Sequence, residues 1–214
     1  MVLHREPFRL GAAALPGELL LPADAHGVVI FAHGSGSGRL STRNTAVARH
    51  LHGLGLATVL FDLLGEDEAI DRSKVFDIGL LTERLMWALD WSAEQAPTRE
   101  LPIGVYGAST GAAAALSVAA LRPDDVAAVV SRGGRPDLAV SLRAVRAPTL
   151  LVVGGDDVPT LRLNRTALHE LRCEKELAIV AGATHLFEEP GALEIVAQKT
   201  GHWFARHLAG VRMT

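Results

Sequence analysis

Short apolar runs alternate along the chain with longer amphipathic stretches in a regular order. The short runs are apolar on both faces and end near glycine, aspartate or histidine, which is typical of buried parallel strands. They predict strands at 28–32, 58–62, 103–106, 126–131, 149–153 and 177–180. The stretches between them predict helices at 42–53, 76–92, 110–121, 136–143, 159–173 and 191–208. Two weaker strands, at 8–13 and 17–21, would turn over Leu15, Pro16 and Gly17 and add an antiparallel edge.

This alternation predicts an α/β fold, with a mostly parallel sheet covered by helices on both faces. We find no internal repeat and no linker, so residues 1–214 are expected to form a single domain. Hydrophobic residues make up 49% of the chain and charged residues 21%, which is typical of a globular protein.

The charge pattern narrows the class of partner. A net charge of −3 without a basic block gives no sign of binding to nucleic acid or to an anionic membrane surface.

The chain contains one cysteine, Cys173, so no internal disulfide can form. The first ten residues lack the pattern of a signal peptide, and we expect a cytoplasmic protein. The oligomeric state is left open.

A glycine-rich loop follows the first buried strand in the stretch VVIFAHGSGSGRLSTRN, residues 28–44. Such a loop could hold either a pyrophosphate or an oxyanion. A dinucleotide site needs the pattern G-x-G-x-x-G. Gly34 and Gly36 fit its first two positions, but the third falls on Arg39. The dinucleotide interpretation is therefore the weaker one, and no cofactor is expected.

The pentapeptide at 107–111, Gly-Ala-Ser-Thr-Gly, fits the G-x-S-x-G pattern of a nucleophile elbow. It lies between a predicted strand and an alanine-rich helix, as an elbow requires. Glycine two residues before and after Ser109 removes side chains that would collide in the strained turn. The start of the helix would direct the backbone N–H of Thr110 at the group that Ser109 attacks.

A serine nucleophile needs a base and an acid, which in this type of sheet follow it in the order acid, then histidine. His185 is the strongest base candidate, because it alone among the nine histidines follows a late strand directly. His33 is more easily explained by hydrogen bonds to nearby backbone, and His50, His52, His169, His202 and His207 by exposed helix positions. Asp156 and Asp157 follow the preceding strand, and the residues alone do not separate them. No metal site is expected.

Six stretches in this order resemble the α/β-hydrolases of the dienelactone hydrolase-like group, including small members fused to phosphoribosyltransferase domains. They are FAHGSGSGRLSTRN, FDLL, GASTGAAAAL, RGGRPDL, LLVVGGDDVPTLRLN and GATHLFEEPGALE, and they cover nearly the whole chain. The resemblance supports Ser109 and His185 and places the acid on Asp157, the fourth position of the Gly-Gly-x-Asp turn. Dienelactone hydrolases in the strict sense have cysteine at the elbow, so dienelactone itself is not the expected substrate.

The expected function is hydrolysis of small soluble esters by Ser109, His185 and Asp157 through an acyl-enzyme, as in a carboxylesterase. Backbone N–H groups of Ser35 and Thr110 are the predicted oxyanion hole. A thioesterase or lactonase with the same triad, or a hydrolase-like protein that binds a ligand without turnover, are the alternatives.

The predicted elements leave no room for a large lid, so we expect an open site. Arg39 and Arg132 are candidates for pairing with a substrate carboxylate. The alternative is that such arginines pair with local carboxylates, for instance Asp137, and tie loops together.

Overall fold

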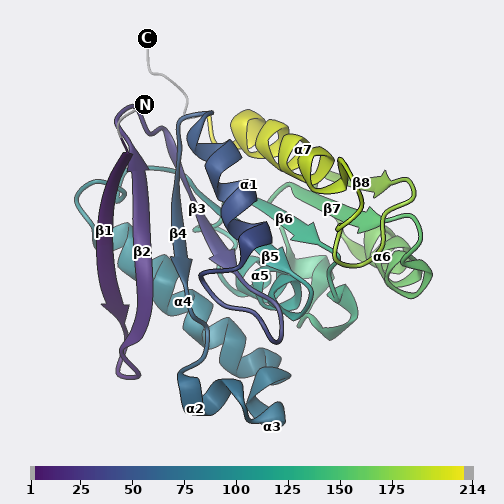
Figure 1. Cartoon of the computed structure of the whole chain (residues 1–214), viewed down its shortest axis with the longest axis horizontal. Helices are drawn as coiled ribbons and strands as arrows, with labels where there is room; N and C mark the ends of the chain where they lie inside the picture. Colours follow the sequence, from purple (N-terminus) through teal and green to yellow (C-terminus); the bar gives the residue numbers. More distant parts are fainter. Residues whose placement is uncertain (1–2, 210–214) are drawn as a thin grey trace.

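A computed structural model describes residues 3–209 of the chain. Eight strands form one sheet in the order β1-β2-β4-β3-β5-β6-β7-β8 (Figure 1). All neighbouring strands are parallel from β4 to β8, and β1 and β2 add an antiparallel edge. The strands are β1 (Leu3–Leu10), β2 (Leu15–Pro22), β3 (Gly27–Ala32), β4 (Leu56–Phe61), β5 (Ile103–Ala108), β6 (Ala128–Arg132), β7 (Thr149–Gly154) and β8 (Lys175–Val180).

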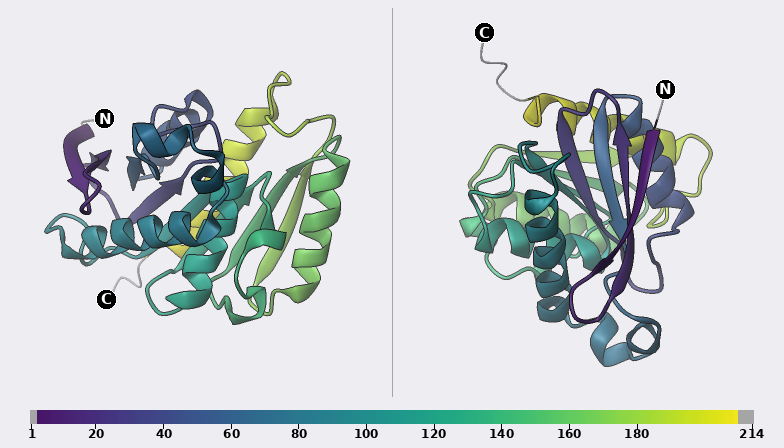
Figure 2. Two further views of the ribbon diagram at one scale, coloured as in Figure 1. Left: turned by 90° about the horizontal axis from the view of Figure 1, so that it is seen from below. Right: turned by 90° about the vertical axis from the view of Figure 1, so that its left-hand side faces the viewer.

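Helices cover both faces of this sheet (Figure 2). One apolar cluster joins the sheet to α1 and α7, and a second joins it to α4, α5 and α6. The helices are α1 (Thr42–His52), α2 (Glu66–Ala69), α3 (Arg72–Val75), α4 (Ile78–Glu94), α5 (Thr110–Leu121), α6 (Val158–Glu170) and α7 (Ala192–His207). The architecture is that of the α/β-hydrolase fold, which confirms the predicted fold class.

The edge hairpin differs from the expected one in the position of its turn. The chain turns over residues 11–14, where the N–H of Ala14 donates to the carbonyl of Gly11 at 3.0 Å. Gly11 and Ala14 both have positive φ, at 61° and 49°. Pro16 and Gly17 instead lie in β2, which pairs with β1 on one side and with β4 on the other. The predicted turn at Leu15, Pro16 and Gly17 was therefore wrong, and the observed turn lies a few residues earlier in the chain.

Two further segments differ from the prediction. The stretch expected as a helix at 136–143 forms only two short 3-10 turns, at Pro136–Leu138 and Leu142–Ala144. The short helices α2 and α3 were not expected, because four residues are too few to show a helical period. His52 is also buried rather than exposed, and its Nε2 lies 2.8 Å from the hydroxyl of Thr58.

Helix α5 lies close against β3 and β5, and two glycines make this approach possible. A Cβ at Gly107 would collide with the backbone of Gly111 and Ala112. A Cβ at Gly111 would collide with the carbonyl oxygens of Ala32 and His33 at the end of β3. Ten of the twelve residues of α5 are buried, and its first turns consist mainly of alanine. The packing of α5 thus fixes the position of the residue before it, Ser109.

We expect Gly111→Ala to destabilise the protein by about 3 kcal/mol or more, because the added methyl group meets rigid backbone rather than a side chain that can rotate away. Gly65→Ala is the matched control, since its Cβ would lie 3.7 Å from Oε2 of Glu68, an ordinary van der Waals contact. The control should change the free energy of unfolding in urea by less than about 0.5 kcal/mol. Equal effects of the two substitutions would contradict the close approach described for α5.

Candidate active site

Ser109 occupies the strained turn between β5 and α5. Its φ is 52° and its ψ −118°, a conformation that residues other than glycine rarely adopt. Its backbone N–H donates to the carbonyl of Arg132 at 3.1 Å, and its carbonyl accepts from the N–H of Arg135 at 3.2 Å. The side chain is half-buried at the carboxyl edge of the sheet. The elbow is thus held by hydrogen bonds to the end of β6 and to the loop that follows it.

His185 and Asp157 form a direct pair. Nδ1 of His185 lies 2.7 Å from Oδ2 of Asp157, and the two side chains are 40% and 11% exposed. Asp157 is also the N-cap of α6, where its Oδ1 accepts from the N–H of Thr160 at 3.3 Å. Asp156 is exposed, and its backbone N–H donates to Ala183. The structure therefore brings Asp157, and not Asp156, to His185.

The carboxyl of Asp157 stays ionised to a lower pH than an ordinary aspartate. Burial by itself raises the pKa of Asp157, because it disfavours the charged form. Hydrogen bonds from Thr160 and His185 stabilise the carboxylate and together outweigh burial, so the pKa of Asp157 is lowered. A carboxylate in this position can hold the N–H of an imidazole and stabilise the imidazolium.

His185 reaches the same edge of the sheet as Ser109. A Cβ built on Gly133 would lie 3.4 Å from Nδ1 and Cε1 of His185, so the imidazole lies close to Gly133. Gly133 follows β6, and β6 pairs with β5 up to Ala108, the residue before the elbow. Within residues 3–209, no hydrogen bond joins the hydroxyl of Ser109 to His185. Such bonds are often long in a free enzyme and tighten when substrate binds.

The glycine-rich loop lies directly against the elbow. A Cβ at Gly34 would be only 3.0 Å from the Cβ of Ser109, so no larger residue fits there without a shift. The backbone N–H of Ser35 donates to Oγ1 of Thr110 at 3.0 Å. The two residues predicted to form the oxyanion hole are therefore in direct contact, although their catalytic role stays a prediction.

His33 links this loop to the neighbouring strand β4. Its Nε2 accepts from the N–H of Leu63 at 2.9 Å, which places the ring proton on Nδ1, 3.0 Å from the carbonyl of Gly34. Burial lowers the pKa of His33, so the ring is held neutral. These hydrogen bonds to backbone match the structural role expected for His33.

The two candidate substrate-binding arginines have different surroundings. Arg39 donates its backbone N–H to Asp62 at 2.6 Å, and its guanidinium lies 3.4 Å from the same carboxylate. Arg132 is 7% exposed, and its guanidinium carbon lies 5.7 Å from the centre of the Phe187 ring. Arg135 pairs with Asp137 at 2.7 Å, as the alternative interpretation expected. The proposed substrate contacts of Arg39 and Arg132 stay predictions.

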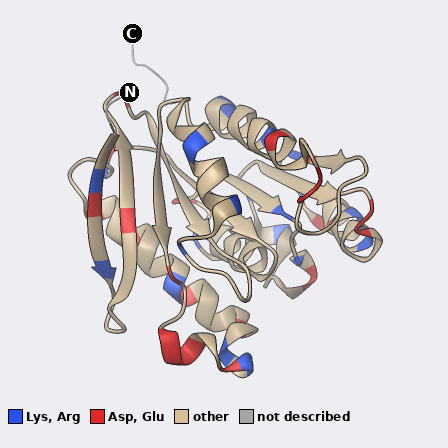
Figure 3. Cartoon of the chain, viewed as in Figure 1, with Lys and Arg blue, Asp and Glu red and all other residues tan. Residues whose placement is uncertain are grey.

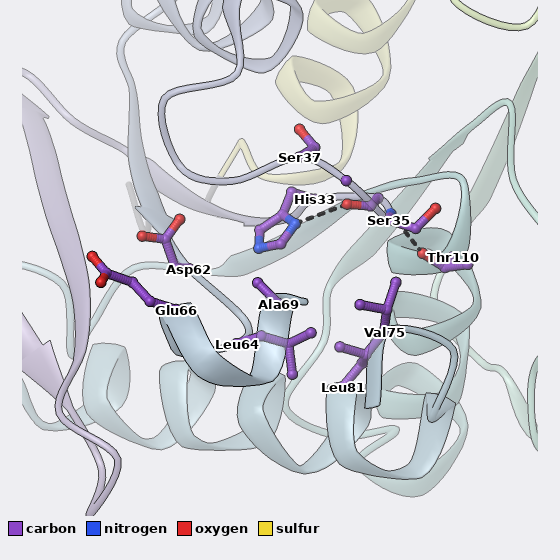
Figure 4. A pocket seen from close by; sticks show the side chains of 12 residues that line it. His33, Ser35, Ser37, Asp62, Leu64, Glu66, Ala69, Val75, Leu81 and Thr110 are labelled. Atoms are coloured by element: carbon purple, nitrogen blue, oxygen red, sulfur yellow. Dashed lines mark hydrogen bonds between the residues drawn. The ribbon is translucent and has the colours of Figure 1, made fainter. Parts of the chain in front are cut away.

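The sequence did not single out a pocket beside Ser35 and Thr110. Its far wall comes from α2 and α3 together with Asp62 and Leu64, which follow β4 (Figure 4). Within the described residues, no three metal-ligating side chains form a cluster, and no helix is long and apolar enough to cross a membrane.

The comparisons with known proteins agree with this geometry. No protein family model matches the chain. A crystal structure of dienelactone hydrolase from Anabaena variabilis is 50% identical in sequence and superimposes with a TM-score of 0.90, covering 97% of this chain and 98% of that one. The chain belongs to the dienelactone hydrolase family. It has the α/β-hydrolase fold.

Two further comparisons concern the shared fold and the length of related proteins. The esterase Est1E from Butyrivibrio proteoclasticus shares the fold, with a TM-score of 0.79 at 15% identity over 95% of this chain and 99% of that one. A Mycobacterium tuberculosis protein named "Putative phosphoribosyl transferase Rv0571c" is 53% identical over 201 residues, which are 94% of this chain. The chain spans only 45% of that relative's length.

In this dienelactone hydrolase family member, Asp157→Asn should reduce the free energy of unfolding by about 1 kcal/mol near neutral pH. Asparagine caps a helix as well as aspartate, so the loss reports the missing charge beside His185. Because the folded-state pKa of Asp157 is depressed, its stabilisation is present above the unfolded pKa of about 4 and disappears as the pH falls through the folded value.

The exposed neighbour provides the control, and urea titrations between neutral and acid pH make the measurement. Asp156→Asn should leave the free energy of unfolding nearly unchanged at every pH. A gap between wild type and Asp157→Asn that stays constant below pH 4 would contradict the role given to this carboxylate.

Proposed function

We propose that the chain is a serine hydrolase that cleaves small soluble esters through an acyl-enzyme, with Ser109 as nucleophile, His185 as base and Asp157 as the acid of a triad. One observation carries the proposal. A serine in a strained elbow shares one edge of the sheet with a histidine whose Nδ1 is 2.7 Å from a carboxylate. This arrangement leaves Nε2 of His185 as the ring nitrogen able to accept a proton.

The proposed reaction has two halves. In the first, Nε2 of His185 takes the proton of the Ser109 hydroxyl while Oγ forms a bond to the ester carbonyl carbon. The tetrahedral intermediate then loses its alcohol as the C–O bond breaks, and the imidazolium of His185 returns the proton to the departing oxygen. In the second half, water gives a proton to His185 and attacks the carbonyl carbon of the acyl-enzyme. The bond to Ser109 Oγ then breaks, the imidazolium of His185 returns the proton to Oγ, and the carboxylic acid leaves.

The oxyanion would be held by the backbone N–H groups of Thr110 and Ser35. In the free protein the N–H of Ser35 donates to the Thr110 hydroxyl, so it would have to turn from that hydroxyl to the substrate oxygen. The Thr110 hydroxyl also has its own proton to donate. It can therefore hold the glycine loop before substrate binds and then add a third donor directed at the developing charge. This assigns Thr110 two roles, one through its backbone and one through its side chain.

A thioesterase or lactonase with the same triad is the alternative within this proposal, since the same attack on a carbonyl serves all three. The transferase name of the M. tuberculosis relative belongs to a protein more than twice as long as the matching segment. We propose hydrolysis alone for this chain.

Ser109→Ala is expected to lower kcat for a short-chain p-nitrophenyl ester by on the order of 10⁴- to 10⁶-fold, because the covalent step is lost. A fluorophosphonate probe should label wild type at Ser109 and leave this variant unlabelled. Ser141→Ala is the control, since Ser141 is exposed and far along the chain from the elbow. Undiminished labelling and turnover in Ser109→Ala would refute the proposed mechanism.

Thr110→Val should lower kcat by about tenfold with little change in KM, because valine keeps the volume but removes the hydroxyl that contacts Ser35. Thr110→Ser retains the hydroxyl and should stay within about twofold of wild type. Steady-state kinetics with one ester, together with urea unfolding of each variant, separates a catalytic effect from lost stability. Identical kinetics for the valine and serine variants would show that the Thr110 hydroxyl does not stabilise the oxyanion.

A further inference from the structure

A pocket of about 350 Å³ opens beside the two predicted oxyanion donors. Figure 4 shows Ser35 and Thr110 at one end, Leu64, Ala69, Val75 and Leu81 along its floor, and Asp62 and Glu66 at the other end. Every lining residue lies between His33 and Thr110 in the sequence. The pocket is thus built from one side of the elbow, away from the loops that carry Asp157 and His185.

This placement selects which part of an ester would enter the pocket. A tetrahedral carbon on Ser109 carries the serine oxygen, the oxyanion, the leaving oxygen and the acyl chain. The leaving oxygen must face His185, which donates its proton and lies close to Gly133. The oxyanion must face Ser35 and Thr110. The acyl chain takes the remaining direction, and the pocket begins at the oxyanion donors on the side opposite to His185.

The middle of the pocket is apolar. Leu64 follows β4, Ala69 ends α2, Val75 ends α3 and Leu81 lies in the first turns of α4. Each methylene group of an acyl chain that leaves water for such a surface improves binding by about fourfold. This segment therefore favours a linear or compact hydrocarbon next to the carbonyl.

The far end of the pocket carries negative charge. Asp62 follows β4, which is separated from β5 and Ser109 by β3 alone. Two strand spacings place it about 10 Å from the elbow. Its carboxylate already faces Arg39, but none of the described basic groups lies within 4 Å of Glu66. The pocket lining includes no lysine or arginine, and Figure 3 shows the acidic first turn of α2 at this end.

We propose that this pocket binds the acyl group of the substrate and selects an apolar chain that ends in a cation, with Glu66 facing the positive charge. The inference rests on the proposed serine hydrolase function and adds the substrate class. An acyl chain with a carboxylate at the same position is disfavoured, since it would lie next to the like charge of Glu66, whereas the charge of Asp62 is balanced by Arg39. A chain of six bonds spans about 7 Å, which reaches from the elbow toward these carboxylates.

Three p-nitrophenyl esters with the same leaving group test this selection. Their acyl groups are a hexanoyl chain ending in a trimethylammonium group, its uncharged tert-butyl isostere, and a hexanoyl chain ending in a carboxylate. We expect kcat/KM for the cationic ester to exceed that of the tert-butyl ester by about fivefold, as for an ion pair at a partly exposed site. The carboxylate ester should fall below the tert-butyl ester by a similar factor.

Glu66→Gln identifies the residue responsible. It should bring the preference for the cationic over the tert-butyl ester close to parity, because Asp62 is already paired with Arg39 and Glu66 supplies the charge that faces the ligand. Asp67→Asn is the matched control, since it removes the same charge from the same turn of α2 but Asp67 does not line this pocket. The preference should stay near fivefold in the control, and it should weaken in wild type as salt is added.

The outcomes separate this inference from the function on which it rests. Equal kcat/KM for the three esters, with Ser109 still labelled by a fluorophosphonate, would overturn the acyl pocket and leave the hydrolase proposal standing. Failure of both labelling and turnover would instead refute the serine hydrolase itself.

Discussion

The close approach of helix α5 to strands β3 and β5 is the constraint on which the site depends. Because Gly107 and Gly111 present no side chain, only Ser109 separates the end of β5 from the start of α5. Ser109 is thereby forced into a conformation with φ of 52°. The buried alanine-rich helix and the surrounding sheet stabilise this turn. A strained residue of this kind is kept only where its neighbours leave it no alternative.

The other parts of the site are positioned by the parallel sheet. The carboxyl ends of β3, β5, β6, β7 and β8 lie along one edge, so the loops after these strands meet there although they are distant in sequence. This is why Gly34, Ser109, Gly133, Asp157 and His185 lie near one another. The hydrogen bond between His185 and Asp157 joins the loops after β7 and β8, the last two strands of the sheet.

The sequence predicted those features that rest on local chemistry. The six parallel strands, the elbow and the loop histidine each have a pattern of residue types that few other structures require. The choice of Asp157 over Asp156 needed either family resemblance or geometry, because both residues follow the same strand. The helices α2 and α3 and the pocket that they line were missed, since four residues are too few to show a helical period. The Pro-Gly pair at residues 16 and 17 led to a wrong prediction of the hairpin turn. In the structure, the pairing of this segment with β4 outweighs its local turn preference.

The two halves of the chain contribute different parts of the candidate site. The pocket wall comes from residues between His33 and Thr110, whereas Asp157 and His185 come from the last third of the sequence. Under the proposed function, substitutions in the first half would alter which acyl group is accepted without moving Asp157 and His185. A lineage with this layout could diversify its substrates through drift in the segment from Leu64 to Leu81 while selection holds the later loops constant. The same separation makes that segment the natural region for directed evolution of new specificities.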